Sequence, residues 1–169
     1  VKNNYSGIRI EAGSLISESG NIAQGHTVRN YFKLINPSFE NDAATTQTPT
    51  GWTESGTVAA SFVSNTSAYS GTYELRIWSA STFNVTTSQT VTSIPNNTYV
   101  LRARVRTGGG QTTASMTASG FGGTQKSVSI KDSTLSSWKL YEITGINVTN
   151  GTCTVSFNVN SPGGKTLEI

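Results

Sequence analysis

Short runs in which apolar and polar residues alternate constrain the fold of this chain more than any other feature. In the sharpest run, residues 99–106, apolar residues at odd positions alternate with Arg102, Arg104 and Arg106. Successive side chains of a β-strand point to opposite faces, so the pattern predicts a strand with one buried face and one arginine face. Thr, Ser, Asn and Gly are abundant, which favours strands and turns over long helices.

Comparable runs recur along the chain and predict about eight to ten short strands. In residues 73–78, for example, Leu75 and Ile77 face one side while Arg76 and Trp78 face the other. Turn-forming residues such as Gly108-Gly109-Gly110 separate the runs, and no segment predicts a long helix. One-sided patterning in regular short strands indicates an all-β fold, either an antiparallel sandwich or a barrel. The other strand-like runs are 7–12, 31–35, 59–63, 83–91, 115–118, 127–130, 138–143 and 153–159.

Residues 1–30 differ from the remainder of the chain because they are polar and contain one strand-like run. We expect them to form an extended N-terminal arm or linker whose strand can pair with a sheet edge, and residues 31–169 to form the compact domain. The chain ends within a strand-like run, so a closing strand is expected beyond Ile169. We interpret His26, the single histidine, as a surface residue, because no second His and no Cys lies near it.

Composition excludes several classes of partner. The formal charge of +3 is small and dispersed, which argues against a nucleic-acid partner. No apolar run reaches the length of a membrane span, so membrane insertion is not expected. The single Cys153 excludes a disulfide framework and is predicted to be a buried free thiol. Low charge and a high content of Ser, Thr and Asn suit a secreted, extracellular bacterial module, with a virion surface as the alternative.

The motif Asn36-Pro37-Ser38-Phe39-Glu40, followed by Thr48-Pro49-Thr50-Gly51-Trp52, resembles the opening of carbohydrate-binding modules with the galactose-binding-like fold. The resemblance covers residues 34–169 and is nearest in character to the galactan-binding modules of bacterial endo-galactanases. It implies an antiparallel jelly-roll β-sandwich, preceded here by the N-terminal arm. Arg104 stands where that family usually carries an outward aromatic residue. The likeness continues in order through residues 69–75, 88–91, 97–101, 105–111 and 120–123.

The same resemblance implies a structural calcium ion. In the family the ion is bound by the Glu of the opening motif, by backbone oxygens of a loop, and by an Asp of the closing strand. The first two correspond here to Glu40 and to the loop from Ser70 to Tyr73, whereas the Asp would follow Ile169. Calcium takes six to eight oxygen ligands, and turns supply carbonyl oxygens readily. The alternative is that Glu40 caps a turn.

Aromatic residues form the first group of candidate ligand-binding residues. Trp52, Trp78 and Phe121 are candidates because an aromatic ring can stack on the flat apolar face of a sugar. For Trp52 the alternative is a core residue or a plug beneath a loop. Trp78 has the better claim to exposure because it lies opposite Leu75 and Ile77. Trp138 is expected in the core.

The second group is a stripe of arginines at period two, Arg102, Arg104 and Arg106, with Arg76 on an adjacent strand. A guanidinium fork binds carboxylate, phosphate or sugar hydroxyl groups through two parallel hydrogen bonds. Gln111 adds an amide to this group. The alternative is a solvated face on which Glu74 or Glu142 neutralises the arginines.

No catalytic constellation is apparent, so we predict that the chain is not an enzyme. Glu40, Asp42 and Glu54 could supply a carboxylate pair, but small sandwiches with so few acids are usually binding modules. We predict a non-catalytic carbohydrate-binding module that targets a partner domain to a polysaccharide, either β-galactan-like or an acidic glycan. The partner would be a catalytic domain in the same chain or neighbouring subunits. The alternative is a structural or receptor-binding domain of a phage tail or fibre, with the arm docked on neighbouring subunits.

Overall fold

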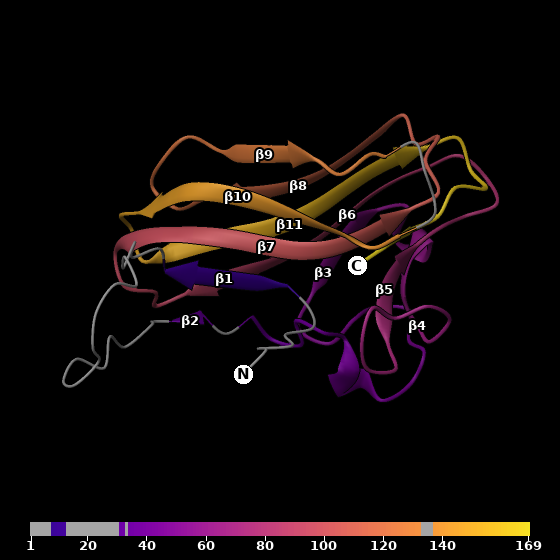
Figure 1. The fold of residues 1–169 in the computed structure, drawn as a ribbon, viewed down its shortest axis with the longest axis horizontal. Helices are drawn as coiled ribbons and strands as arrows, with labels where there is room; N and C mark the ends of the chain where they lie inside the picture. The colour runs from indigo at the N-terminus through magenta and orange to yellow at the C-terminus, as the bar shows by residue number, and fades with distance from the viewer. Residues whose placement is uncertain (1–7, 13–30, 33, 133–136) are drawn as a thin grey trace, which may run out of the picture.

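The computed structural model describes residues 8–12, 31–32, 34–132 and 137–169 (Figure 1). His26 therefore lies outside the described residues. Strands account for nearly all of the regular structure, together with the short 3₁₀ helices η1 (Glu40–Asp42) and η2 (Val58–Ala60). The strands are β1 (Arg9–Ala12), β2 (Tyr31–Phe32), β3 (Thr53–Gly56), β4 (Ser61–Ser64), β5 (Glu74–Ile77), β6 (Phe83–Thr92), β7 (Asn97–Thr107), β8 (Thr113–Ser119), β9 (Lys126–Ser129), β10 (Lys139–Val148), β11 (Thr152–Ser161) and β12 (Leu167–Glu168).

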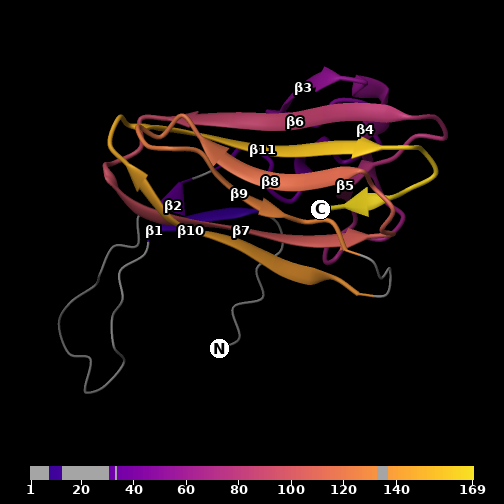
Figure 2. The ribbon, with the colours of Figure 1, turned by 90° about the horizontal axis from the view of Figure 1, so that it is seen from above.

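The strands form two antiparallel sheets that pack face to face, as the sequence predicted. The first sheet has the order β2-β1-β7-β12-β5-β4, with β10 on the other side of β7. The second has the order β3-β6-β11-β8-β9. Figure 2 shows β7 and β10 on one side of the sandwich and β6 and β11 on the other. The prediction of an all-β antiparallel sandwich is therefore confirmed.

Strand β7 is the centre of the seven-stranded sheet. It pairs with β10 along one edge, while β1 and β12 share its other edge at Tyr99–Arg102 and Arg106–Thr107. The backbone N–H of Ile8 also donates to the carbonyl oxygen of Pro37 at 2.9 Å. The strand expected in the N-terminal arm thus pairs with an edge of the domain's own sheet. The division of the chain at residue 30 stays a prediction.

Inward residues of both sheets build one core. The alternation expected for β7 is confirmed, since Tyr99, Leu101, Ala103 and Val105 are all buried. The facing strand β11 buries Cys153, Val155, Phe157 and Val159 in the same way. Cys153 is a free thiol, as predicted, and its burial raises the pKa to about 11. Since each fully buried large apolar side chain stabilises the fold by roughly 1.5–3 kcal/mol, this shared core holds the two sheets together.

The opening motif forms a loop that Gln89 of β6 holds in place. The side-chain oxygen of Gln89 accepts from the N–H of Ile35 at 2.6 Å, and its amide nitrogen donates to the carbonyl oxygens of Ile35 and Gly51. Within the loop, the ring of Trp52 lies between the rings of Phe39 and Phe157, with centroids 5.7 and 6.1 Å away. The motif that carries the family resemblance is therefore an element of the fold.

Candidate functional site

The outer face of the seven-stranded sheet carries a row of aromatic and charged side chains. Glu168 of β12 lies between Arg106 of β7 and Arg76 of β5 in the strand register. Trp138 extends the row beyond Arg106, whose guanidinium carbon is 5.7 Å from the centre of the Trp138 ring. Phe62 of β4 extends it beyond Arg76. The alternation of short strands thus brings residues from five segments of the chain into one line.

The arginines of β7 differ in their partners. Arg106 pairs with Glu168, whose carboxylate is almost completely buried, with an Nη2–Oε2 distance of 2.5 Å. Arg102 pairs with Glu142. Arg104 forms no ion pair among the described residues, and its guanidinium carbon lies 4.8 Å from the centre of the Tyr69 ring. Arg104 therefore keeps an unneutralised guanidinium that a ligand can approach.

Two aromatic rings flank these arginines. Tyr69 comes from the loop before β5 and is 40% exposed. Its ring meets that of Trp138 edge to face, with the centroids 5.8 Å apart. We call Tyr69, Arg104, Arg106 and Trp138 the arginine–aromatic cluster. An exposed ring beside an unpaired guanidinium is the combination that sugar recognition uses, because the ring takes the apolar face and the fork takes the hydroxyl groups.

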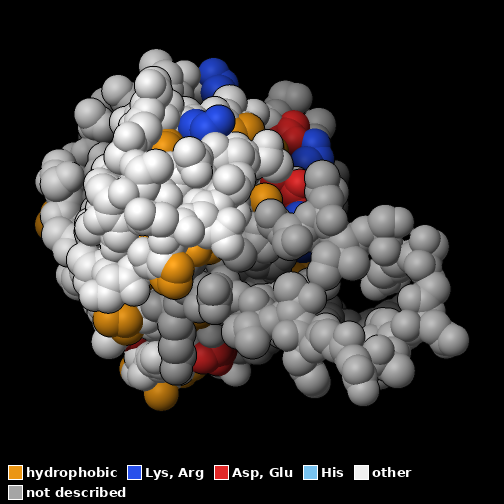
Figure 3. Space-filling view, turned by 90° about the vertical axis from the view of Figure 1, so that its left-hand side faces the viewer, with side chains coloured by type: hydrophobic (Ala, Val, Ile, Leu, Met, Phe, Trp, Pro, Cys, Tyr) orange, Lys and Arg blue, Asp and Glu red, His pale blue; other side chains and the backbone are white. Residues whose placement is uncertain are grey.

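Exposed apolar side chains gather on the same face. Trp78, just beyond β5, is 38% exposed, and Leu140 of β10, opposite Arg104 in the register, is 47% exposed. In the end-on view of Figure 3, Lys/Arg and Asp/Glu atoms also lie side by side on the right, where β10 and β7 lie. Exposed apolar side chains next to charged ones mark this side of the sandwich as the better candidate for binding.

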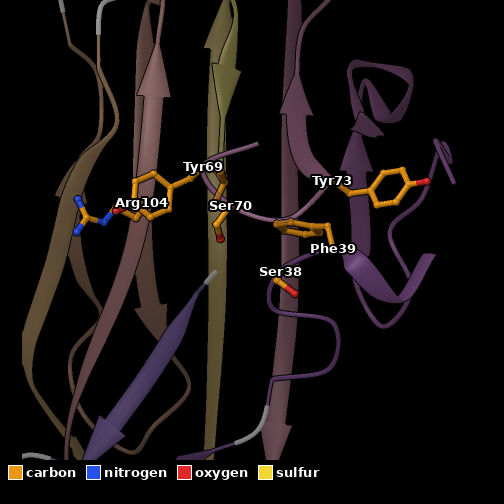
Figure 4. Close-up of a pocket in the computed structure, with 7 residues that line it drawn as sticks. Ser38, Phe39, Tyr69, Ser70, Tyr73 and Arg104 are labelled. Carbon is orange, nitrogen blue, oxygen red and sulfur yellow. The ribbon is translucent and has the colours of Figure 1, made fainter. Parts of the chain in front are cut away.

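A small hollow adjoins Arg104 and Tyr69. Figure 4 shows these two side chains together, with Ser38 and Phe39 across from them and the ring of Tyr73 pointing away. Ser70 also lines the hollow, and its hydroxyl oxygen is buried without a hydrogen-bond partner among the described residues. The hollow thus has the unpartnered hydroxyl group of Ser70 and the side chain of Arg104 in its lining.

The loop that carries Tyr69 is held by Glu74 of β5. One carboxylate oxygen of Glu74 accepts from the backbone N–H groups of Thr66 and Ser67, both at 3.2 Å. Glu74 is almost completely buried, and this desolvation raises the pKa of its carboxyl group. Glu74 therefore positions the loop and with it the ring of Tyr69.

Three predicted ligand-binding residues lie in the interior, and the prediction for them is corrected. Trp52, Gln111 and Phe121 are 5%, 1% and 2% exposed. The indole N–H of Trp52 donates to the carbonyl oxygen of Asn36 at 3.3 Å, and the amide of Gln111 donates to that of Thr166 at 3.1 Å. These side chains support the opening loop and the turns, and they present almost no surface to a polysaccharide.

The other predicted ligand-binding residues lie on or beside the outer face of the seven-stranded sheet. These are Arg76, Trp78, Arg102, Arg104 and Arg106, all of which retain exposed surface. The Nε atom of Arg76 is a buried donor without a partner in the described part of the chain. Binding by these five residues stays a prediction that their positions support.

The sequence reasoning missed Tyr69 and placed Trp138 wrongly. Trp138 lies on the outer face rather than in the core, with its ring beside Arg106. The signal was present, because Leu140 and Glu142 lie on the face of β10 opposite the buried Ile143, and Trp138, just before the strand, continues their alternation. For Tyr69 no periodic signal exists, since its loop follows no strand pattern.

The calcium prediction concerns Glu40 and the loop from Ser70 to Tyr73. One oxygen of Glu40 accepts from the backbone N–H groups of Thr72 and Tyr73, both at 2.8 Å. Amide hydrogens repel a cation, and within the described residues no group of three or more His, Cys, Asp or Glu is placed to hold a metal ion. These contacts fit a carboxylate that caps a turn, and they do not supply the six to eight oxygens that calcium takes. Calcium binding stays a prediction of the resemblance.

The carboxylates considered for catalysis serve local contacts. Asp42 accepts from the side-chain amide of Asn36 at 2.6 Å and from the N–H and hydroxyl groups of Thr50. Glu54 accepts from the hydroxyl group of Thr48 at 3.0 Å. Together with Glu40 they stabilise the opening loops. Among the described residues, no helix has the length and apolar character to span a bilayer.

Solved structures share this architecture, although no protein-family model matches the chain. The structure of TmCBM61 in complex with β-1,4-galactotriose matches 79% of this chain and 90% of its own, with a TM-score of 0.70 and 25% identity. The enzymatically active domain of tailspike protein 4 of bacteriophage CBA120 matches 70% of this chain and 18% of its own, with a TM-score of 0.51 and 17% identity. This second likeness concerns the fold alone.

One characterised protein is similar in sequence. A 1,6-alpha-glucosyltransferase of Sporosarcina globispora is 32% identical over 173 residues, which include 90% of this chain. The chain spans 13% of the length of that protein. Together with the match to TmCBM61, the sandwich fold confirms the resemblance to carbohydrate-binding modules that the opening motif predicted.

Proposed function

We propose that this chain, which has the β-sandwich fold of carbohydrate-binding modules, is itself a non-catalytic module of that kind and binds polysaccharide on the arginine–aromatic cluster. The observation that carries the proposal is the position of Arg104. Its guanidinium lacks an acidic partner among the described residues, lies against the exposed ring of Tyr69, and lines the same hollow as the unpartnered hydroxyl group of Ser70. An unneutralised cation in such surroundings is stabilised by a ligand that accepts its hydrogen bonds.

In the proposed mode of binding, aromatic rings and guanidinium groups contact different parts of the sugar. Tyr69 and Trp138 stack on the apolar face of a sugar, while Arg104 and Arg106 donate to its hydroxyl groups. The edge-to-face contact of the two rings and the ion pair of Arg106 with Glu168 hold these groups in place before the ligand arrives. A site organised in advance loses less conformational entropy on binding.

For the ligand we propose a β-galactan-like polysaccharide, with an acidic glycan as the second candidate. The first rests on the similarity to TmCBM61, which was solved with β-1,4-galactotriose. The second rests on Arg104, because a guanidinium fork also matches a carboxylate. A neutral β-1,4-galactan and polygalacturonate, tested side by side, distinguish the two.

We further propose that the module acts outside the cell and keeps a partner domain close to polysaccharide. The similarity to a segment of a much longer glucosyltransferase supports a catalytic partner in the same chain. Tethering raises the effective concentration of the partner at the polymer without any contribution to the chemical step. A neutral polymer would require little electrostatic attraction, in keeping with a formal charge of +3.

The test is titration of β-1,4-galactotriose and trigalacturonate into the wild type and three variants by calorimetry. R104A is expected to weaken the better ligand roughly tenfold or more, and R104K to restore little of the affinity because Lys lacks the fork. K165A is the matched control, since it removes an exposed cation that is not among the predicted ligand-binding residues. Equal affinity of R104A and wild type for every glycan bound would place the site elsewhere.

The second hypothesis, a structural domain of a phage tail or fibre, has support from the fold of a tailspike domain only. It requires docking on neighbouring subunits, whereas β1 pairs with β7 of its own chain. Light scattering separates the two hypotheses, because a trimer or ring in solution would favour the phage assembly and a monomer the carbohydrate-binding module.

A further inference from the structure

A second hollow lies at the end of the sandwich where β8 turns into β9 and β10 ends. It is lined by the loop from Phe121 to Lys126 together with Gly145, Asn147 and Thr149. None of these residues belongs to the arginine–aromatic cluster. Figure 3 views this end of the molecule, where uncharged side chains and backbone cover most of the centre. The hollow is therefore a separate feature of the surface.

The loop that forms one wall is fixed by hydrogen bonds to the neighbouring turn. The N–H of Thr149 donates to the carbonyl oxygen of Phe121 at 3.0 Å, and the side chains of Asn150 and Thr152 both donate to that of Gly120. Gly122 has a φ of +86°, and a Cβ there would lie 2.0 Å from the hydroxyl oxygen of Thr149. Only glycine fits at this position, because a side chain would collide with Thr149 and the backbone has the left-handed conformation that glycine adopts.

A β-bulge forms the opposite wall. The register of β10 with β7 shifts between Ile143 and Ile146, and Gly145 within the bulge has a φ of +66°. The ammonium nitrogen of Lys126 is 3.6 Å from the place that a Cβ of Gly145 would occupy. Bulges redirect side chains and are conserved features next to binding sites. Here the bulge leaves room for the Lys126 side chain to lie against the strand.

The charge in the hollow is not neutralised. No acidic residue of the described part of the chain lines it, and the ammonium group of the half-buried Lys126 has no hydrogen bond or ion pair with any described residue. The other lining groups are the amides of Gln125 and Asn147, the hydroxyl groups of Thr124 and Thr149, and glycine backbone. Amides, hydroxyl groups and an ammonium group can all donate hydrogen bonds, and together they favour an oxyanion.

We propose that this hollow binds an oxyanion carried by a polysaccharide, either a uronic carboxylate or a sulfate ester. The hollow would then read the acidic groups of the polymer, while the arginine–aromatic cluster stacks on its sugar rings. The proposal rests on the proposed function in one respect, that the ligand is a glycan. It assigns the anion to Lys126 rather than to Arg104.

The experiment is an NMR titration of the ¹⁵N-labelled chain with trigalacturonate, galactose 6-sulfate and β-1,4-galactotriose. The two acidic probes distinguish carboxylate from sulfate, and the neutral trisaccharide is the control. We expect the acidic probes to shift the amide signals of Gly122, Gly123 and Gly145, and K126A to weaken that response at least about fivefold. K165A is the matched control, because it removes the same charge from an exposed loop.

The outcomes separate this proposal from the proposed function. If acidic probes shift no amide of the hollow, or if K126A and K165A weaken binding equally, the hollow is not an anion site. If K126A affects only the acidic probes and R104A only galactotriose, both sites stand. If R104A loses all binding and K126A binds as the wild type does, the proposed anion site in the hollow is wrong and the proposed site on the arginine–aromatic cluster is retained. If acidic probes shift the amide signals of the hollow but the chain binds no neutral sugar, the anion site is retained and the proposed function is not.

Discussion

The two outer faces of the sandwich are built from the same alternating strands and differ in their chemistry. The face of the seven-stranded sheet carries arginines, glutamates and exposed rings. On the opposite face, the outward residues of β6, β11 and β8 are all Ser, Thr or Asn. These residues are Asn84, Thr86, Ser88, Thr90, Thr92, Thr113, Ser115, Thr117, Ser119, Thr152, Thr154, Ser156, Asn158 and Asn160.

The hydroxyl face satisfies its own polar groups. The hydroxyl of Thr86 donates to the amide oxygen of Asn158 at 3.0 Å, and the hydroxyl groups of Thr90 and Thr154 lie 2.8 Å apart. On the other face, Arg104 has no acidic partner among the described residues. The comparison indicates that small polar residues on neighbouring strands satisfy one another's hydrogen-bonding groups. A stripe of arginines instead leaves a guanidinium group that can bind a ligand.

The largest effect expected from this comparison is loss of glycan binding when Trp138 is removed. Truncation of a central aromatic contact commonly costs about 2 kcal/mol or more, so W138A should weaken binding roughly thirtyfold. T154A on the hydroxyl face is the matched control and should change the dissociation constant less than about twofold. Calorimetric titration measures both. If binding depends on Thr154 and not on Trp138, the binding site lies on the hydroxyl face instead.

A smaller effect should separate two arginines of the same strand. R106A leaves the buried carboxylate of Glu168 without its partner and should lower the free energy of unfolding by about 1–3 kcal/mol. R104A removes no ion pair and should change it by less than about 0.5 kcal/mol. Denaturation in guanidinium chloride measures the difference. Equal loss in the two variants would mean that Arg104 is also a structural residue.

A pH effect of modest size is expected from Glu74. Its pKa in the folded state is raised above the ordinary value of 4.5 by desolvation. The folded state therefore binds more protons than the unfolded state, and stability falls as pH rises from about 4.5 through the raised pKa. E74Q keeps an acceptor for Thr66 and Ser67 and cannot ionise. The free energy of unfolding of wild type minus that of E74Q should thus decline across this window, and parallel curves would contradict the assignment.

The smallest effect is expected from chelation. Because Glu40 accepts two backbone N–H groups, E40A should lower the free energy of unfolding by about 1–2 kcal/mol. EDTA should leave the melting temperature of the wild type unchanged if Glu40 caps a turn. Differential scanning calorimetry with calcium and with EDTA provides the measurement. If EDTA lowers the melting temperature of the wild type but not that of E40A, the result would instead support the calcium ion that the family resemblance implies.

The fold was predictable wherever one side of a strand is buried. β7 and β11 alternate clearly because their inward residues meet the opposite sheet. β3 was missed because all four of its residues retain exposed surface, so no alternation marks it. The run expected at residues 59–63 begins as the helix η2 and becomes β4 only at Ser61. Local sequence thus predicts strands that face the core and misses strands at the edge.

The site was predictable in part. The arginine stripe follows from strand periodicity and lies where it was expected. Tyr69 could not be predicted because its position depends on a loop that folds over the sheet and is held by the buried Glu74. Trp52 and Phe121 were candidates because aromatic residues suit both sugars and cores, and periodicity does not distinguish the two in loops. The hollow at Lys126 depends on the register shift in β10. That shift is seen only in the pairing of β10 with β7 and could not be read from the sequence.

The buried thiol of Cys153 makes it possible to measure how often the core of the sandwich opens. Its pKa of about 11 and complete burial make the folded chain unreactive to alkylating reagents near neutral pH. As the single cysteine of the chain, it reacts only in molecules whose sheets have parted. The rate of labelling in excess reagent therefore counts opening events of the core, and its change upon glycan addition would report how firmly an occupied face holds the two sheets together.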